Sequence, residues 1–294
     1  MFSNPRYAVG FMAVLVATFT ATPIWASGPV SEAAGPSVVL PAGGRLDSPD
    51  GPGKPKPVKP TIVLVHGAFA DGSSWQKVTE SLQRDGYTVI AAANPLEGLA
   101  QDAARLSSTI APIEGPIVLV GHSYGGAVIS QAAEGNPKVK ALVYIAALIP
   151  DTGEQVSALV ARATTSQLGP ALVPTNYTNA DGSTGTQLTV NPDKFRDVFA
   201  ADVPADVTRV IAAQQRPTDA AAFSSVPTAA AWHTIPSWSL IARQDLALSA
   251  DLERFEADRA HSTTVEVDSS HVPMFSQTKA VTDLIIDAAN STAR

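Results

Sequence analysis

Apolar, β-branched runs alternate with amphipathic segments over most of the chain. The clearest runs, Thr61 to Val65 and Pro116 to His122, have the unbroken hydrophobicity of strands buried on both faces of a parallel sheet. Further strands are expected at 87–93, 140–149, 237–242 and 263–267, and helices at 74–84, 99–110, directly after residue 123, at 251–260 and at 278–289. Because strands alternate with helices, we predict an α/β fold with a mostly parallel sheet, flanked by helices and joined by right-handed crossovers.

The alternation fails between residues 151 and 232. This stretch is rich in Thr, Asn, Pro and Ala, with a hairpin expected at 179–182 and helices near 194–200 and 205–215. An insertion of this size between two sheet strands is best placed over the carboxyl ends of the strands, where open α/β sheets bind ligands. We therefore expect a globular domain over 61–294 with an inserted lid at 151–232.

The N-terminal region has the pattern of a targeting segment followed by a spacer. Arg6 precedes an apolar run over 8–20, and small residues around Ala26 suit cleavage, which predicts a signal peptide at 1–26. The alternative, an uncleaved anchor, is disfavoured because the run falls short of the ~20 residues of a membrane span. The Pro/Gly-rich stretch 27–60 reads as a flexible linker. We expect export to the periplasm or medium, with no membrane span after cleavage.

Composition removes several classes of function. The chain has 294 residues, 45% of them hydrophobic, and a net charge of −7 without a basic cluster, which argues against nucleic-acid binding. It contains no cysteine, so disulfides, thiolate metal sites and a cysteine nucleophile are excluded.

The motif Gly-x-Ser-x-Gly falls between an expected strand and an expected helix. Gly121 and Gly125 bracket Ser123, and glycines allow the strand and helix to approach closely while the serine hydroxyl projects above the sheet. Ser123 is therefore the candidate nucleophile. The alternative is a glycine-rich turn with a solvated serine.

A serine nucleophile needs a base, and the chain offers five histidines. His66 and His122 directly adjoin expected turns and are interpreted as supports of those turns, and His233 and His261 as solvated residues. His271 lies in the loop between the last strand and the last helix, which returns over the carboxyl edge of the sheet. His271 is thus the candidate base.

The third member should be an acid that orients the base. Asp245 follows the strand ending at residue 242, and the order Ser123, Asp245, His271 is the order of α/β-hydrolases. Asp151, after the preceding strand, is the rival. Asp268 is close to the histidine in sequence but is interpreted as a surface residue.

Two backbone N–H groups are candidates for an oxyanion hole. They belong to Tyr124, which opens the helix after the serine, and to Ala68, which follows the first strand. The alternative for the His66-Gly67 turn is simply a tight exit from the strand. Phe69 and Trp75 are candidates for the wall of a substrate pocket, although aromatic residues near a turn also serve as core.

The stretches LVHGAFADGSSW at 64–75 and GHSYGG at 121–126 resemble the α/β-hydrolase superfamily. They are similar in particular to the compact esterase branch that includes plant methyl esterases and hydroxynitrile lyases. The resemblance implies a Ser-His-Asp esterase without cofactor or metal. The lyases carry Thr where this chain has Gly67 and Lys where it has Val272, which argues against lyase activity; dehalogenases and epoxide hydrolases carry Asp where Ser123 stands.

We therefore expect a serine hydrolase of small-molecule carboxylic esters or related acyl compounds. A perhydrolase or acyltransferase would use the same triad with another acyl acceptor. A non-catalytic protein that holds an apolar ligand under the lid is a third hypothesis, disfavoured because all triad positions are present. Specificity resides in the lid, so the sequence specifies neither the substrate nor the oligomeric state.

Overall fold

The computed structural model describes residues 58–291; the expected signal peptide and nearly all of the expected linker lie outside the described residues. Its centre is a six-stranded parallel sheet with the order β2-β1-β3-β4-β8-β9. The strands are β1 (Thr61–Val65), β2 (Val89–Ala92), β3 (Ile117–Ser123), β4 (Val139–Ala147), β8 (Ser237–Ala242) and β9 (Thr263–Val267). The predicted α/β fold with a parallel sheet is confirmed.

The two central strands are buried because their sequences are apolar throughout. All seven residues of β3 are buried, and β1 is buried from Ile62 onward. The two strands pair in parallel, so that Val65 at the end of β1 lies opposite Gly121 near the end of β3. This register brings the turns that follow both strands to the same edge of the sheet.

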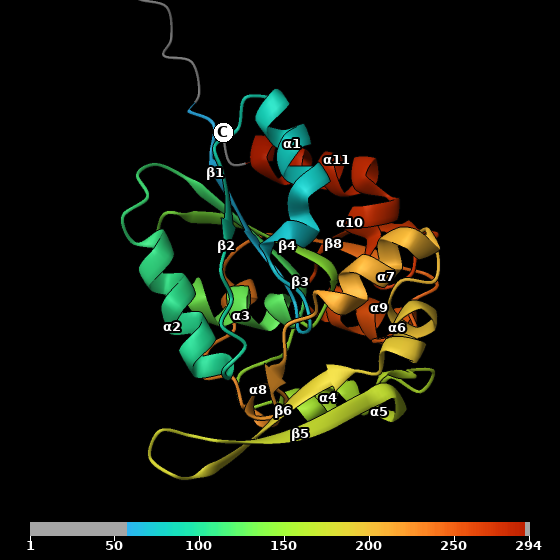
Figure 1. The fold of residues 1–294 in the computed structure, drawn as a ribbon. Coiled ribbons are helices and arrows are strands. Elements are labelled where there is room, and N and C mark those ends of the chain that lie inside the picture. The colour runs from blue at the N-terminus through green and yellow to red at the C-terminus, as the bar shows by residue number, and fades with distance from the viewer. Residues whose placement is uncertain (1–57, 292–294) are drawn as a thin grey trace, which may run out of the picture. The chain divides into compact units, whose positions relative to one another are not determined.

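Helices cover both faces of the sheet (Figure 1). On one face α1 (Gln76–Arg84) packs against α11 (Thr278–Ser291), and on the other α2 (Leu99–Ile110) packs against α3 (Tyr124–Ala132). Helix α9 (Ala250–Arg259) packs against β8. Two short elements complete this part: η1 (Gly72–Trp75) and α10 (Pro273–Ser276).

The segment between β4 and β8, where a lid is expected, carries a small sheet of its own. Strands β5 (Leu172–Thr178), β6 (Thr184–Val190) and β7 (Thr218–Asp219) pair antiparallel, and Gly182 N donates to Asn179 O at 2.9 Å in the hairpin turn. Its helices are α4 (Val156–Val160), α5 (Leu168–Ala171), α6 (Pro192–Phe199), α7 (Ala205–Ala213), α8 (Ala221–Ser224) and η2 (Ala231–His233). Of these elements, β5, β6, α4, α5 and α8 lie beyond the carboxyl ends of β1 and β3 (Figure 1).

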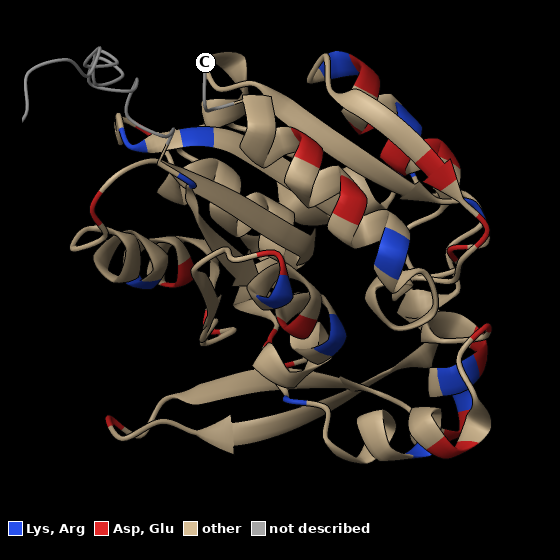
Figure 2. Ribbon diagram, turned by 90° about the horizontal axis from the view of Figure 1, so that it is seen from above, with Lys and Arg blue, Asp and Glu red and all other residues tan. Residues whose placement is uncertain are grey.

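Charged residues occupy the helices and loops around the central sheet. Figure 2 shows acidic and basic positions interspersed on these outer elements. Among residues 58–291, no helix has the length and apolar character needed to cross a membrane.

Candidate active site

Ser123 stands on a strained turn between β3 and α3. Its backbone has φ 54° and ψ −125°, a left-handed conformation that is costly for a residue with a Cβ. The turn is tight enough that a Cβ on Gly121 would lie 2.6 Å from the Gly125 carbonyl oxygen. Strain at Ser123 is maintained by this close packing, which leaves the residue 6% exposed at the sheet edge.

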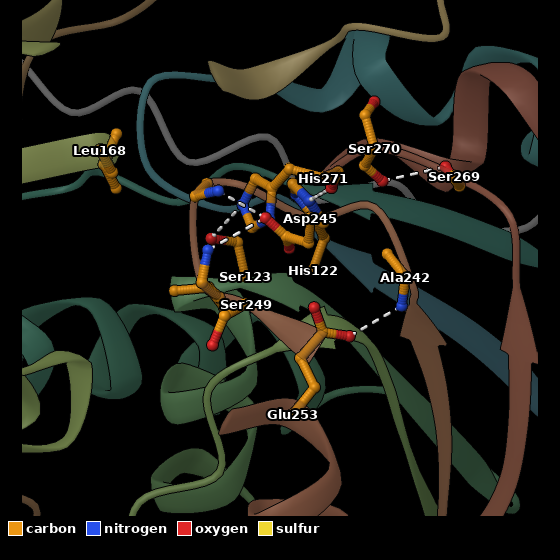
Figure 3. Close-up of polar contacts among 12 residues, drawn as sticks. His122, Ser123, Leu168, Ala242, Asp245, Ser249, Glu253, Ser269, Ser270 and His271 are labelled. Atoms are coloured by element: carbon orange, nitrogen blue, oxygen red, sulfur yellow. Dashed lines mark hydrogen bonds and ion pairs between the residues drawn. The ribbon is translucent and has the colours of Figure 1, made fainter. Parts of the chain in front are cut away.

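His271 meets Ser123 from the loop after β9. Its Nε2 lies 2.9 Å from Ser123 Oγ, and the imidazole is fully buried (Figure 3). The distance is that of a hydrogen bond between nucleophile and base. His271 is thus placed to take the hydroxyl proton.

Asp245 occupies the other side of the imidazole. Its Oδ2 lies 2.5 Å from His271 Nδ1, and its Oδ1 accepts the amides of Ala247 at 2.6 Å and Leu248 at 3.0 Å. Burial by itself would raise the pKa of Asp245, but His271 and the hydrogen bonds lower that pKa below its ordinary value. The carboxylate therefore stays ionised and holds the Nδ1–H tautomer of His271.

The two rival acids are engaged elsewhere. Asp151 Oδ1 lies 2.8 Å from Nε2 of His233, and both side chains are substantially exposed. Asp268 accepts from Nε of Arg243 at 2.8 Å on the surface. Of the three candidates, the structure brings only Asp245 to His271.

His66 and His122 are buried beneath the catalytic loops. His66 Nε2 accepts the amide of Asn94 at 3.2 Å, and its Nδ1 lies 2.9 Å from the Gly67 oxygen, within its own turn. His122 supports a different segment than expected, because its Nε2 lies 2.8 Å from the carbonyl oxygen of His271. Burial first, and then His271, lower the pKa of His122 to about 3, so it is a neutral donor to the catalytic loop.

The two candidate oxyanion donors flank the nucleophile. Tyr124 is the first residue of α3, and the first amides of a helix have no partner within it. Ala68 lies in the turn after β1, next to Gly67, where an added Cβ would come within 2.7 Å of Ser123 Cβ. Only a residue without a side chain fits that position, so the turn lies directly against the serine.

An apolar pocket opens beside these turns. Phe69, Val272 and Phe275 of the core line it together with Phe195 and Phe199 of α6. Its wall also includes His122, Ile211 and Met274, with Gln214, Ser73 and Asp71 among its polar residues. The pocket therefore lies between the catalytic core and the lid.

One aromatic residue of the site, Phe199, is not predicted from the sequence, and one predicted residue, Trp75, lies elsewhere. The Phe199 ring meets the His271 imidazole edge-on, with centroids 4.6 Å apart, and so packs against the base. Trp75, expected in the pocket wall, is instead fully buried and packs edge-on against His122. It is core because η1 turns its side chain inward. Phe195 and Phe199 were missed, although two aromatics four residues apart in a polar helix are a signal for an inward face.

No group of three or more histidine or acidic side chains within residues 58–291 has the arrangement of a metal site.

A serine on a strained strand-to-helix turn, with its acid and its histidine after later strands of one parallel sheet, defines the class of α/β hydrolases. The model of the Alpha/beta hydrolase family matches residues 62–284, and the chain belongs to this family. The resemblance indicated by the two turns is confirmed.

Relatives agree with this assignment. Methyl jasmonate esterase 1 of Vitis vinifera is 27% identical over 241 residues, which cover 74% of this chain and 91% of that protein. Carbendazim hydrolyzing esterase of Nocardioides sp. (strain SG-4G) is 32% identical over 115 residues, only 35% of this chain and 48% of that protein. Among solved structures, polyneuridine aldehyde esterase matches with a TM-score of 0.69 at 18% identity, over 78% of this chain and 99% of that one. The structural match concerns the fold.

Proposed function

We propose that this protein is a serine hydrolase that cleaves carboxylic esters or related small acyl compounds. The observation that carries the proposal is the continuous hydrogen-bonded chain from Ser123 Oγ through His271 to Asp245, with distances of 2.9 and 2.5 Å. Such a chain activates a hydroxyl that is otherwise a weak nucleophile. The names of the relatives, which include several esterases, support an ester as the substrate.

The reaction proceeds in two halves. Ser123 Oγ attacks the ester carbonyl while His271 Nε2 accepts the hydroxyl proton, and the imidazolium then gives this proton to the departing alcohol. Water next attacks the acyl-enzyme, with His271 again as base, and the carboxylic acid leaves as Ser123 recovers its proton. Asp245 keeps the imidazole in the correct tautomer and stabilises the imidazolium in both halves.

The negative charge on the carbonyl oxygen is stabilised by backbone donors. We assign this role to the N–H groups of Ala68 and Tyr124, which lie on the two turns that meet at Ser123. Preorganised donors of this kind contribute a factor of about 10² to 10³ to kcat in serine hydrolases.

The substrate groups expected in the pocket are apolar. Four phenylalanines line it, Phe69, Phe195, Phe199 and Phe275, and His122 is also part of its wall. A small ester with an apolar or aromatic substituent suits such a lining because burial of apolar area supplies the binding energy.

A series of p-nitrophenyl esters of increasing acyl length, assayed with matched serine variants, tests the proposal. We expect Ser123→Ala to lower kcat by several orders of magnitude, on the order of the ~10⁶ known for triad knockouts, with an unchanged thermal midpoint. Ser239→Ala is the control, because Ser239 is equally buried and its Oγ has no hydrogen-bond partner. Near-native turnover by Ser123→Ala would remove this serine from the mechanism.

A further inference from the structure

Helix α9 turns two glutamates into the interior. Glu253 is 3% exposed and Glu256 fully buried, and they lie one helical turn apart. Glutamates are almost never fully buried unless they are paired or protonated. The proposed mechanism uses neither side chain, so both need an explanation.

Glu253 reaches the loop that carries the triad acid. Its Oε2 accepts the amide of Ala242 at 2.9 Å, at the end of β8 and three residues before Asp245. Its other oxygen, Oε1, is buried without a hydrogen-bond partner, and Figure 3 shows it on the side of Glu253 that faces the Asp245 carboxylate. Glu256 is directed elsewhere, since its Oε1 accepts the amide of Ile149 at 2.5 Å.

The charged groups around Glu253 favour its neutral form. Burial first, and then the Asp245 carboxylate, raise the pKa of Glu253 well above its ordinary value, and Glu256 acts in the same direction. Strand β8 contributes no titratable side chain. Tyr144 of β4 faces Glu256, and burial first, and then Glu256, raise the pKa of Tyr144. His271 faces Asp245 from the opposite side. Two neighbouring carboxyl groups that are both buried away from water do not both ionise.

The hydrogen bonds decide which carboxyl holds the proton. Asp245 accepts from three N–H groups, those of His271, Ala247 and Leu248. Glu253 accepts from one, the amide of Ala242. Donors stabilise an anion, so the negative charge belongs on Asp245 and the proton on Glu253.

We propose that Glu253 is a positioning residue of the triad: its protonated Oε1 donates to the Asp245 carboxylate and fixes the orientation in which Asp245 meets His271. This inference rests on the proposed serine hydrolase function. Glu253 does not touch the reacting atoms. It acts through Asp245, and its proton stays on Glu253 throughout the reaction.

Two substitutions at position 253 distinguish the hydrogen-bonding role of the side chain from the space that it fills. Glu253→Gln keeps an acceptor for the Ala242 amide and a neutral N–H donor toward Asp245. Glu253→Met keeps the volume and loses both. Glu256→Gln is the matched control, because it alters a buried neutral glutamate on the same helix face that does not contact Asp245.

The readout is kcat/KM across pH, with thermal midpoints as a check of folding. We expect the kcat/KM of Glu253→Gln and Glu256→Gln to stay within about threefold of the unaltered protein's value. The acidic limb of the profile, where kcat/KM falls at low pH, should stay at the same pH in both variants. Glu253→Met should lose about tenfold or more, as for a hydrogen bond to a charged group, and its acidic limb should move to higher pH. The limb moves up because an Asp245 anion without its donor attracts a proton to His271 more strongly.

The opposite sign of this shift would overturn the proposal. If Glu253 were ionised, Glu253→Gln would remove a negative charge, and the acidic limb of its pH profile would move to lower pH by roughly one unit. This result would overturn the proposal even if Glu253→Met fails to fold. A folded Glu253→Met with unchanged kcat/KM would also overturn it. Ser123→Ala, assayed alongside, separates the two claims: its activity tests the hydrolase function, whereas the variants at 253 test only the positioning role.

Discussion

Asp245 combines two tasks in one carboxylate, one oxygen for each. Oδ1 accepts two amides of its own loop and so anchors the side chain, while Oδ2 faces His271. Because the carboxylate is already fixed, it orients the imidazole without losing conformational entropy at each turnover. Asp151 cannot substitute, because its carboxylate is bound to the exposed His233.

We therefore predict different effects for the two acids. Asp245→Asn favours the wrong tautomer of His271 and should lower kcat by about 10⁴, as in the serine-protease precedent. Asp151→Asn should change kcat by less than about tenfold, since a surface pair contributes little. Steady-state kinetics with a p-nitrophenyl ester compares them. Equal losses in both variants would contradict the assignment of the acid.

The juxtaposition of Ser123, Asp245 and His271 could be predicted from sequence, whereas the place of Glu253 beside them could not. Ser123 ends a readable strand, Asp245 and His271 each follow one, and parallel strands bring such positions to one edge. Glu253 lies in a helix with acidic and basic residues around it, which reads as a solvated face. Its burial depends on how α9 packs against β8, a contact that the local pattern does not encode.

At the scale of elements, the segment between β4 and β8 contacts three of the four loops that form the site. Thr218 of β7 accepts the amide of Phe69 through Oγ1 at 3.1 Å, next to the Ala68 turn. Ser166 donates to the carbonyl of Ala247 at 2.6 Å, in the loop of the triad acid. Asp202, between α6 and α7, accepts from the hydroxyl of Ser270, beside the catalytic histidine. The segment between β4 and β8 is therefore hydrogen-bonded to these loops as well as lining the pocket.

Thr218 provides a test of this positioning role. Thr218→Val keeps the shape but leaves the buried Phe69 amide without its acceptor, so the turn that carries Ala68 should shift. We expect kcat to fall about tenfold, because small displacements of oxyanion donors are costly. Thr208→Val is the control, since Thr208 is also buried in the lid but its hydroxyl bonds only carbonyls of its own segment. Similar kinetics for both variants would show that the Thr218 contact does not matter.

The elements of the core follow from the sequence, but the lid sheet does not. Strands β5 and β6 are largely exposed or half-buried, so their hydrophobic residues do not alternate clearly. The hairpin turn at 179–182 was readable from its Asn, Asp and Gly. Strand β7 has two residues and depends on pairing with a partner about thirty positions earlier, which local patterns do not reveal.

Over the whole molecule, buried acids make stability depend on pH. Burial raises the pKa of Asp102 and of Glu253, and raises the pKa of Glu256 from 4.5 to about 8. Where an acid is neutral in the folded protein and ionised in the unfolded chain, unfolding releases a proton. The free energy of unfolding then falls as pH rises.

For Glu256 this window runs from about pH 4.5 to about pH 8. The contribution of Glu256 to the free energy of unfolding is complete below the lower pH, and it is lost as the pH rises through the upper one. Glu256→Gln keeps an acceptor for Ile149 and removes the titration. We expect the unfolding free energy of the native protein, relative to this variant, to fall by a few kcal/mol across the window. Urea unfolding at both ends of the window measures it; a constant difference would mean that Glu256 is ionised throughout.

The most direct test of the central claim is the site of covalent modification. The folded protein is treated with a fluorophosphonate, digested and mapped by mass spectrometry, with loss of ester hydrolysis followed in parallel. The account predicts one label per chain, on the peptide that contains Ser123, appearing in step with the loss of activity and absent from Ser123→Ala. Attachment at another residue, or full ester turnover in protein whose Ser123 is labelled, would contradict it.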